Sequence, residues 1–287
     1  MPDTAVLKFG GLSLQGKRRF GPNEAALLEE CHRAESVNEI YRLLATRRNS
    51  ARAQRLREVC RDFILPYRDR GVLPVVVVSA FDWATDKLEQ FAAALDDDPE
   101  PHEHARLLMS GELRANAALA LTLNAVGCPA NSFTGREAGI ITTPEPVGAL
   151  IEKVEDENVR ECLERGYVPV VAGFQGYYWD KDTARYEVSI LGRGGSNLTA
   201  VALADALGNT ECTMFSNVDG LYTKDPNKHN DARKIDRIAA RELLTWDPFP
   251  QVIQKDAVLY ACQREVDIWI RDAFDPGIPG TRIICRE

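Results

Sequence analysis

Short runs of apolar residues alternate along this chain with longer segments in which apolar side chains recur at helical spacing. Four of the short runs are predicted to be buried β-strands: residues 5–9, 75–79, 168–173 and 212–216. Four of the longer segments are predicted to be helices: residues 52–67, 103–126, 158–165 and 196–207. Such alternation predicts an α/β fold, in which a largely parallel sheet is covered by helices on both faces.

A glycine-rich stretch at residues 192–200 (GRGGSNLTA) runs directly into one of these predicted helices. The backbone N–H groups of such a turn, together with the helix dipole, attract anions. A second stretch, Lys8-Phe9-Gly10-Gly11, follows the first predicted strand, and Lys8 and Arg193 add positive charge. The glycine-rich stretch has neither the Lys-Ser/Thr ending of a P-loop nor the spacing of a dinucleotide-binding motif. Taken alone, it is either an ordinary turn or half of a phosphate-binding cleft.

A third polar segment follows the predicted strand at residues 212–216. Its sequence, SNVDGLYTKDPN at residues 216–227, begins with a turn around Asn217, Asp219 and Gly220 and has a second turn at Asp225-Pro226. A loop of this composition at the end of a strand in an α/β sheet is well placed to bind a nucleotide.

With these segments in view, the chain resembles the catalytic domain of aspartate kinases, within the wider amino-acid kinase family. The matching stretches occur in the family's order and cover most of the chain: KFGG, VVVVSAFDWATD, SGE at residues 110–112, REAGIIT, VVAGFQG, LGRGGSNLTA, SNVDGLYTKDPN and FDPGIPGTRI. The resemblance implies one amino-acid kinase domain over residues 1–287. An acceptor-binding lobe would occupy about 1–170 and a nucleotide-binding lobe about 171–287. Residues 15–49 form an insertion relative to the family, which we interpret as a surface decoration, a lid or an oligomer contact.

The resemblance also implies roles for individual residues. It assigns catalysis to Lys8 and Asn197. It assigns acceptor binding to Ser79, Thr85, Glu112, Arg193 and Ser196. Arg193 would hold the α-carboxylate of the acceptor and Glu112 its ammonium group. ATP binding falls to Lys8, Gly10, Gly11, Ser13, Asn217, Asp219, Tyr222, Lys224, Asp225, Pro226 and Gln251. Purely structural roles stay open, since Glu112 could begin a helix and Ser79 could end a strand.

Several positions depart from the family's pattern. Asn197 stands where the family has an aspartate, and Gln251 stands where it has a lysine. The loss of an acid and a base from one cleft can be compensatory, because removing either alone leaves its partner charge unpaired. Leu12 and Trp83 are also unusual. Three alternatives follow: a carboxylate kinase in which Lys224 or Lys255 replaces the lost charge, a weakly active or inactive ligand-binding protein, or a kinase for a different acceptor.

Composition narrows the class of protein. The chain has 287 residues, of which 45% are hydrophobic and 27% charged, as in ordinary globular proteins. A net charge of −8 argues against a nucleic-acid partner. The sequence has no apolar run of membrane-spanning length, and its first strand leaves no room for a signal peptide. The seven scattered cysteines indicate reduced thiols and a cytoplasmic location, and the four histidines form no metal-ligand set.

The implied reaction is the MgATP-dependent phosphorylation of the side-chain carboxylate of L-aspartate, or of a close analogue, to an acyl phosphate. A carboxylate is ionised at neutral pH and needs no general base, so catalysis depends on positioning and charge neutralisation. We expect Lys8, with the N–H groups of Gly10 and Gly11, to stabilise the transferred phosphoryl group, and Mg²⁺ to neutralise phosphate charge. A downstream enzyme would consume the product, and the protein could form a homodimer. Because the sequence ends at Glu287, without the family's regulatory modules, we expect no feedback inhibition by lysine or threonine.

Overall fold

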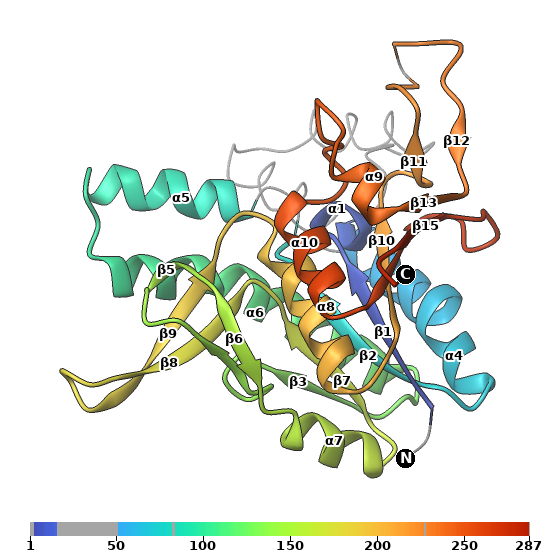
Figure 1. Cartoon of the computed structure of the whole chain (residues 1–287). Helices are drawn as coiled ribbons and strands as arrows, with labels where there is room; N and C mark the ends of the chain where they lie inside the picture. The colour runs from blue at the N-terminus through green and yellow to red at the C-terminus, as the bar shows by residue number, and fades with distance from the viewer. Residues whose placement is uncertain (1–2, 16–50, 82–83, 227, 287) are drawn as a thin grey trace, which may run out of the picture.

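The computed structural model describes residues 3–15, 51–81, 84–226 and 228–286. The predicted insertion at residues 15–49 therefore lies, apart from Gln15, outside the described residues, as does Trp83. The described chain forms one eight-stranded sheet, one five-stranded sheet and a two-stranded ribbon, with helices packed around them (Figure 1). The predicted α/β fold with a largely parallel central sheet is confirmed.

The eight-stranded sheet is the centre of the molecule. Its strands, in spatial order, are β13 (Arg237–Ala239), β15 (Thr281–Ile284), β14 (Asp267–Asp272), β10 (Glu211–Ser216), β1 (Thr4–Phe9), β2 (Leu73–Val78), β7 (Val168–Ala172) and β3 (Ala130–Phe133). Neighbouring strands are parallel, except for the antiparallel pair β14 and β15. The four strands predicted from apolar runs are β1, β2, β7 and β10, and they lie side by side around the middle of the sheet, with β1 between β2 and β10.

Burial on both faces explains why these strands were recognisable. In β2, Val75 and Val77 pack into the core on one face, whereas Val76 and Val78 pack into the core on the other face. A strand covered on both sides needs apolar residues at every position, so it appears in the sequence as an unbroken hydrophobic run.

The five-stranded sheet was not predicted from the pattern of apolar residues. Its order is β5 (Val147–Ala149), β9 (Arg185–Leu191), β8 (Gln175–Asp180), β4 (Ile140–Thr142) and β6 (Ile151–Val154). Strands β4, β5 and β6 have only three or four residues, and β8 and β9 bury polar residues (Gln175, Glu187 and Ser189), so the sheet carries weaker apolar signals. The ribbon pairs β11 (Leu221–Tyr222) with β12 (Lys234–Ile235).

The predicted helices are present with small shifts at their ends. They are α6 (Pro101–Ala125), α7 (Glu157–Glu164) and α8 (Gly195–Ala206), together with a segment that starts as a helix over 51–59 and continues through η1 (Cys60–Ile64) and α4 (Leu65–Asp69). The π-helical turn of η1 ends two residues before Pro66, which has no N–H to donate and so interrupts the regular hydrogen bonds. The structure adds α1 (Gly11–Gln15), α5 (Ala84–Leu95), α9 (Ala240–Leu243) and α10 (Lys255–Gln263).

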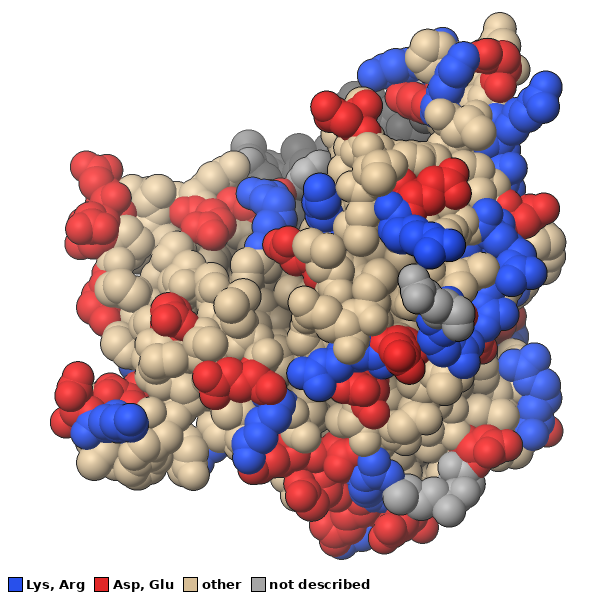
Figure 2. Space-filling view, in the orientation of Figure 1, with Lys and Arg blue, Asp and Glu red and all other residues tan. Residues whose placement is uncertain are grey.

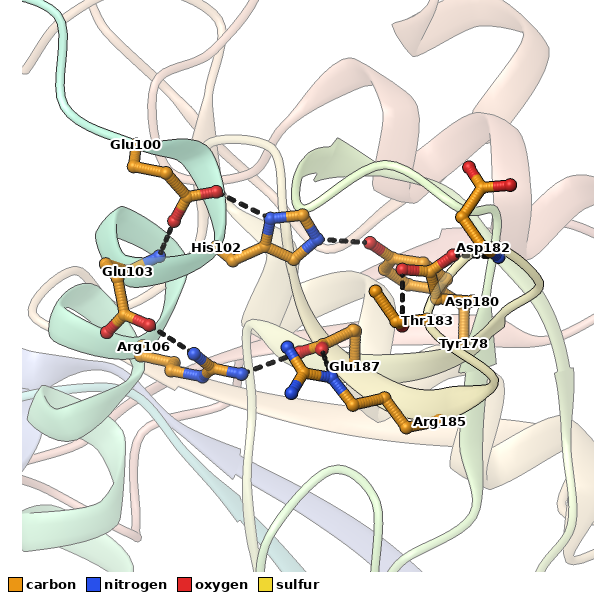
Figure 3. A network of polar contacts seen from close by, with 10 residues as sticks. All are labelled: Glu100, His102, Glu103, Arg106, Tyr178, Asp180, Asp182, Thr183, Arg185 and Glu187. Atoms are coloured by element: carbon orange, nitrogen blue, oxygen red, sulfur yellow. Dashed lines mark hydrogen bonds and ion pairs between the residues drawn. The ribbon is translucent and has the colours of Figure 1, made fainter.

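Helix α6 joins the two larger sheets. Leu119 and Leu123, in its second half, belong to the core on one face of the eight-stranded sheet. Near its start, Ala105 and Leu108 pack against Ile190 of β9. A polar network between α6 and the hairpin of β8 and β9 supports this second contact (Figure 3). Residues in the middle of α6 are therefore held between the two sheets.

Charged residues of both signs are interspersed over the face seen in Figure 2, and acidic side chains gather at its lower edge, over α7. Within the described ranges, no helix combines the length and the apolar composition needed to cross a membrane.

Candidate functional site

A pocket of about 560 Å³ lies where strands β1 and β2 end and helix α8 begins. The segments that line it come from distant parts of the chain: the turn after β1, the end of β2, the starts of α5 and α8, the middle of α6 and Gln254 before α10. The carboxyl ends of parallel strands are the usual place for a ligand in an open α/β sheet. Seven of the predicted site residues reach this pocket together with the two glycines of the first turn: Lys8, Ser79, Thr85, Glu112, Arg193, Ser196 and Asn197, with Gly10 and Gly11.

Lys8 is the cation at the centre of this pocket. It lies on β1, the strand between β2 and β10, opposite Val77 and Met214. Its Nζ is near the Gly10 turn, because a Cβ placed on Gly10 would be 3.6 Å from it. Burial lowers the pKa of Lys8 to about 8, and the nearby Cys212 and Glu112 oppose this shift only in part. Protein atoms thus replace much of the water that would solvate the ammonium group, which strengthens its attraction to an anion.

Glu112 is the buried acid of the same pocket. Its side chain extends from α6, and its Oε1 accepts a hydrogen bond from the N–H of Ala80 at 3.0 Å. Within the described part of the chain, its Oε2 has no hydrogen-bond partner. Burial raises the pKa of Glu112 to about 7, although the Ala80 N–H and Lys8 act in the opposite direction. A buried carboxylate oxygen without a partner is costly, and a cationic ligand group would satisfy it.

The glycine-rich turn connects β9 to α8. Gly194 precedes the helix with φ +83°, a conformation that glycine adopts without strain. The turn is closed by a hydrogen bond from the N–H of Gly195 to the carbonyl of Gly192, at 2.9 Å. The Arg193 side chain is exposed and lines the pocket. Ser196, in the first turn of α8, packs so closely on Gly173 that a Cβ there would be 2.7 Å from the Ser196 Cβ.

A smaller hollow of about 150 Å³ adjoins the main pocket and shares Lys8, Gly10, Gly11 and Asn197 with it. It extends toward the end of β10, where Ser13, Ser216 and Asn217 line it. The two hollows therefore meet at Lys8, so ligands bound in both would both lie next to its ammonium group.

The turn after β1 is held in place by its own polar groups. The N–H of Gly10 and the hydroxyl of Ser13 both donate to the carbonyl of Phe215, at 3.3 and 3.1 Å. The buried Arg55 donates to the carbonyl of Ser13 at 2.7 Å. The Gly10 N–H therefore already has an acceptor in Phe215, and its contact with a phosphate stays a prediction. Gly11 begins α1.

Most of the predicted nucleotide loop lies outside both hollows. Asn217 lines the smaller one, whereas Asp219, Tyr222, Lys224, Asp225 and Pro226 line neither. The carboxylate of Asp219 accepts from Tyr222 Oη at 3.1 Å and from Lys234 Nζ at 3.1 Å. Lys224 forms an exposed ion pair with Asp231 at 2.6 Å. A role for these five residues in ATP binding stays a prediction.

Gln251 is also outside both linings and is exposed. Gln254, three residues later, lines the main pocket and accepts a hydrogen bond from Asn197 Nδ2 at 2.6 Å. Gln254 was not predicted, nor were Asp86, Glu89 and Phe174, which share this lining. The only sequence signal for Gln254 was its place in the segment QVIQK at residues 251–255, which begins with Gln251 in place of the family's lysine. Asp86 was visible as the neighbour of the predicted Thr85.

The arrangement suits an acceptor that carries both charges and a phosphoryl donor. Arg193 and Lys8 can each bind an anion, and Glu112 can bind a cation, all from one pocket. Among the described residues, no group of three or more His, Cys, Asp or Glu side chains is arranged to hold a metal ion.

Comparison with known proteins agrees with this geometry. The model of the amino acid kinase family matches residues 3–272. An aspartokinase of Corynebacterium efficiens is 40% identical over 228 residues, which is 78% of this chain and 53% of that protein. An aspartokinase of Mycobacterium tuberculosis is 37% identical over 82% of this chain and 54% of its own length. The chain thus spans about half the length of the curated relatives it matches.

Solved structures give the same result. The crystal structure of aspartate kinase from Synechocystis superposes with a TM-score of 0.73 at 28% identity and covers 98% of this chain and 40% of that one. The family model extends over nearly the whole sequence, and its match includes both the Lys8 turn and the glycine-rich turn that meet in the pocket. The chain therefore belongs to the amino acid kinase family.

Proposed function

We propose that this protein transfers the γ-phosphoryl group of ATP to the side-chain carboxylate of L-aspartate, giving 4-phospho-L-aspartate and ADP. The observation that carries the proposal is the free, buried Oε2 of Glu112 in a pocket that also contains Lys8 and Arg193. One anion and two cations are the complement of an amino acid with two carboxylates, of which one is the acceptor. The names of the relatives, aspartokinase and aspartate kinase, support the same acceptor.

The acceptor would be held by its main-chain groups. Glu112 binds the ammonium group through Oε2, and Arg193 binds the α-carboxylate with its planar guanidinium. Ser79 and Thr85 line the same pocket and would bond the acceptor's remaining oxygens. These contacts would direct the side-chain carboxylate of the acceptor toward Lys8. Holding this carboxylate next to the γ-phosphate of ATP overcomes the unfavourable approach of two anions.

The chemical step then needs little from the protein beyond charge. A carboxylate oxygen attacks the γ-phosphorus, the bond from that phosphorus to the β,γ-bridging oxygen breaks, and ADP leaves with the electron pair. No proton is moved, so no general base is required. Lys8 lies at the junction of the two hollows, where its ammonium group stabilises the negative charge on the transferred group.

The smaller hollow suits the phosphate end of the nucleotide, since it contains Lys8, the Gly10–Gly11 turn and Asn217. Mg²⁺, when bound, would neutralise phosphate charge, with phosphate oxygens of the nucleotide and water molecules among its ligands. The acyl phosphate would be consumed by an enzyme that reduces it or converts it to an amide. A homodimer and a cytoplasmic location stay part of this proposal.

The test is to trap the product with hydroxylamine, which converts an acyl phosphate into a hydroxamate. We expect hydroxamate to form with MgATP and L-aspartate, and to fall by at least about a hundredfold in Lys8→Ala and in Arg193→Ala. Lys181→Ala serves as the control, because Lys181 is an exposed residue between β8 and β9 and does not line the pocket.

Two other results would lead elsewhere. Absence of hydroxamate while aspartate still binds in calorimetry would indicate a ligand-binding protein that has kept the acceptor site without catalysis. Absence of both would show that aspartate is the wrong acceptor, and carboxylates of similar size would be tested next.

A further inference from the structure

Two side-chain amides meet at the entrance to α8. Asn197 lies in the first turn of this helix and is only 4% exposed. Its Nδ2 donates to Oε1 of Gln254 at 2.6 Å, and both side chains line the main pocket. The Oδ1 of Asn197 is buried and has no hydrogen-bond partner among the described residues. Such an acceptor has lost its water without gaining a donor, which is unfavourable unless a ligand or a neighbouring cation supplies one.

Gln254 is itself tightly placed. It is extended, with φ −85° and ψ +144°, and directly precedes α10. Its side chain lies across the glycine-rich turn, where a Cβ on Gly194 would overlap it. The glycine-rich turn therefore restricts the position of the Gln254 side chain by close packing. Gln254 in turn restricts Asn197 through the hydrogen bond between their amides.

This contact sets which end of the Asn197 amide has a hydrogen-bond partner. An amide has a donor end and an acceptor end of nearly equal shape, so its orientation is set by its hydrogen bonds. Because Gln254 accepts from Nδ2, Oδ1 is the end left without a partner, on a side chain that lines both hollows next to Lys8. In the reverse orientation the NH₂ group would be the unpartnered end, on a side chain that lines the same hollows as the Lys8 ammonium group.

We propose that Gln254 is a positioning residue, which holds the Asn197 amide so that Oδ1 is presented to the junction of the two hollows beside Lys8. The effect of this contact on catalysis rests on the proposed function. An uncharged pair thereby provides an acceptor at a position where the related family pattern has a carboxylate, and it does so without adding negative charge next to the bound phosphates.

The first experiment is a double-mutant cycle on the complete chain, with initial rates from the hydroxamate assay. Gln254→Met keeps the length of the side chain but removes its acceptor oxygen. We expect kcat to fall about fivefold, as for the loss of one hydrogen bond, with KM for aspartate changed less than about twofold. In an Asn197→Ala background, the same substitution should change kcat less than about 1.5-fold. Gln263→Met, at an exposed position of α10, is the matched control.

A second measurement does not depend on activity. The side-chain amide signal of ¹⁵N-labelled Asn197, assigned by its absence in Asn197→Ala, should show a proton protected from exchange with water. We expect this protection to be lost in Gln254→Met and kept in Gln254→Glu, whose carboxylate can still accept, and in Gln263→Met.

The outcomes separate the two proposals. If the wild-type protein forms no hydroxamate but Asn197 loses protection in Gln254→Met, the positioning contact stands and the proposed reaction fails. If the protein is active and Gln254→Met costs the same in both backgrounds, Gln254 acts through packing alone and the positioning role is overturned. Unchanged protection in Gln254→Met overturns it as well.

Discussion

Lys8 and Glu112 carry opposite charges, yet burial moves their pKa values toward each other, to about 8 and about 7. Their mutual attraction would do the reverse, so the loss of water outweighs it at both residues. Near neutral pH, neither group is strongly held in its charged form. A ligand group of opposite charge would therefore stabilise the charged form of each residue. Perturbed groups of this kind, facing one cavity, are typical of a catalytic site.

The raised pKa of Glu112 predicts how the reaction depends on pH. In the free protein, Glu112 is protonated below about pH 7, and a protonated carboxyl binds an ammonium group poorly. We therefore expect kcat/KM for aspartate to decline as the pH falls through about 7. In Glu112→Gln this acid limb should vanish, and kcat/KM at pH 8 should be lower by roughly 10- to 100-fold, as for a lost charge-assisted hydrogen bond. Steady-state rates across the pH range test this, and an acid limb that persists in Glu112→Gln would assign the titration to another group.

At the scale of an element, the turn between β9 and α8 depends on the absence of a side chain at Gly194. Gly194 has φ +83° and its missing side chain makes room for Gln254. Gly208 has a similar φ of +77°, after the end of α8, and nothing lies within 4 Å of where its Cβ would be. The pair separates backbone strain from crowding at the site.

We expect Gly208→Ala to lose about 1 kcal/mol of unfolding free energy from the strained φ, and Gly194→Ala to lose more, because its Cβ also overlaps Gln254. Only Gly194→Ala should also lose activity, by at least about tenfold, because its Cβ displaces Gln254 and moves the start of α8. Chemical denaturation and the hydroxamate assay measure the two effects separately. Equal activity in the two variants would mean that the turn can absorb a methyl group without moving the site.

How much the sequence could predict differs between elements for physical reasons. β1, β2, β7 and β10 were found because strands buried on both faces require continuous apolar runs. The short strands of the second sheet, such as β5 with only three residues, gave no such signal. Lys8, Glu112 and Arg193 were identified through their motifs and do meet in one pocket. Gln254 was missed because its role arises from packing on Gly194, which is 60 positions away in the chain and visible only after folding.

At the scale of the molecule, the site depends on how α6 is held between the two larger sheets. The contact between the start of α6 and β9 contains Glu187, whose side chain is 1% exposed. Glu187 accepts from Arg106 of α6 at 2.7 Å and also pairs with its strand neighbour Arg185 (Figure 3). Because Glu112 lies further along the same helix, this ion pair helps to set the position of Glu112 in the pocket.

Replacing Glu187 by Gln should destabilise the protein and disturb the site together. The substitution removes the charge that both arginines share, and breaking a buried pair costs a few kcal/mol; because the arginines are partly exposed, we expect about 2 kcal/mol. The midpoint of urea unfolding should fall with an unchanged slope. Glu103→Gln, which removes the exposed partner of the same Arg106, should cost less than about 0.5 kcal/mol.

In native Glu187→Gln, KM for aspartate should rise while kcat changes less, since the loosened helix carries Glu112 but not Lys8. Equal stability of the two variants would show that solvent screens the Glu187 pairs, and the position of α6 would then depend on its apolar contacts with β9 and the central sheet.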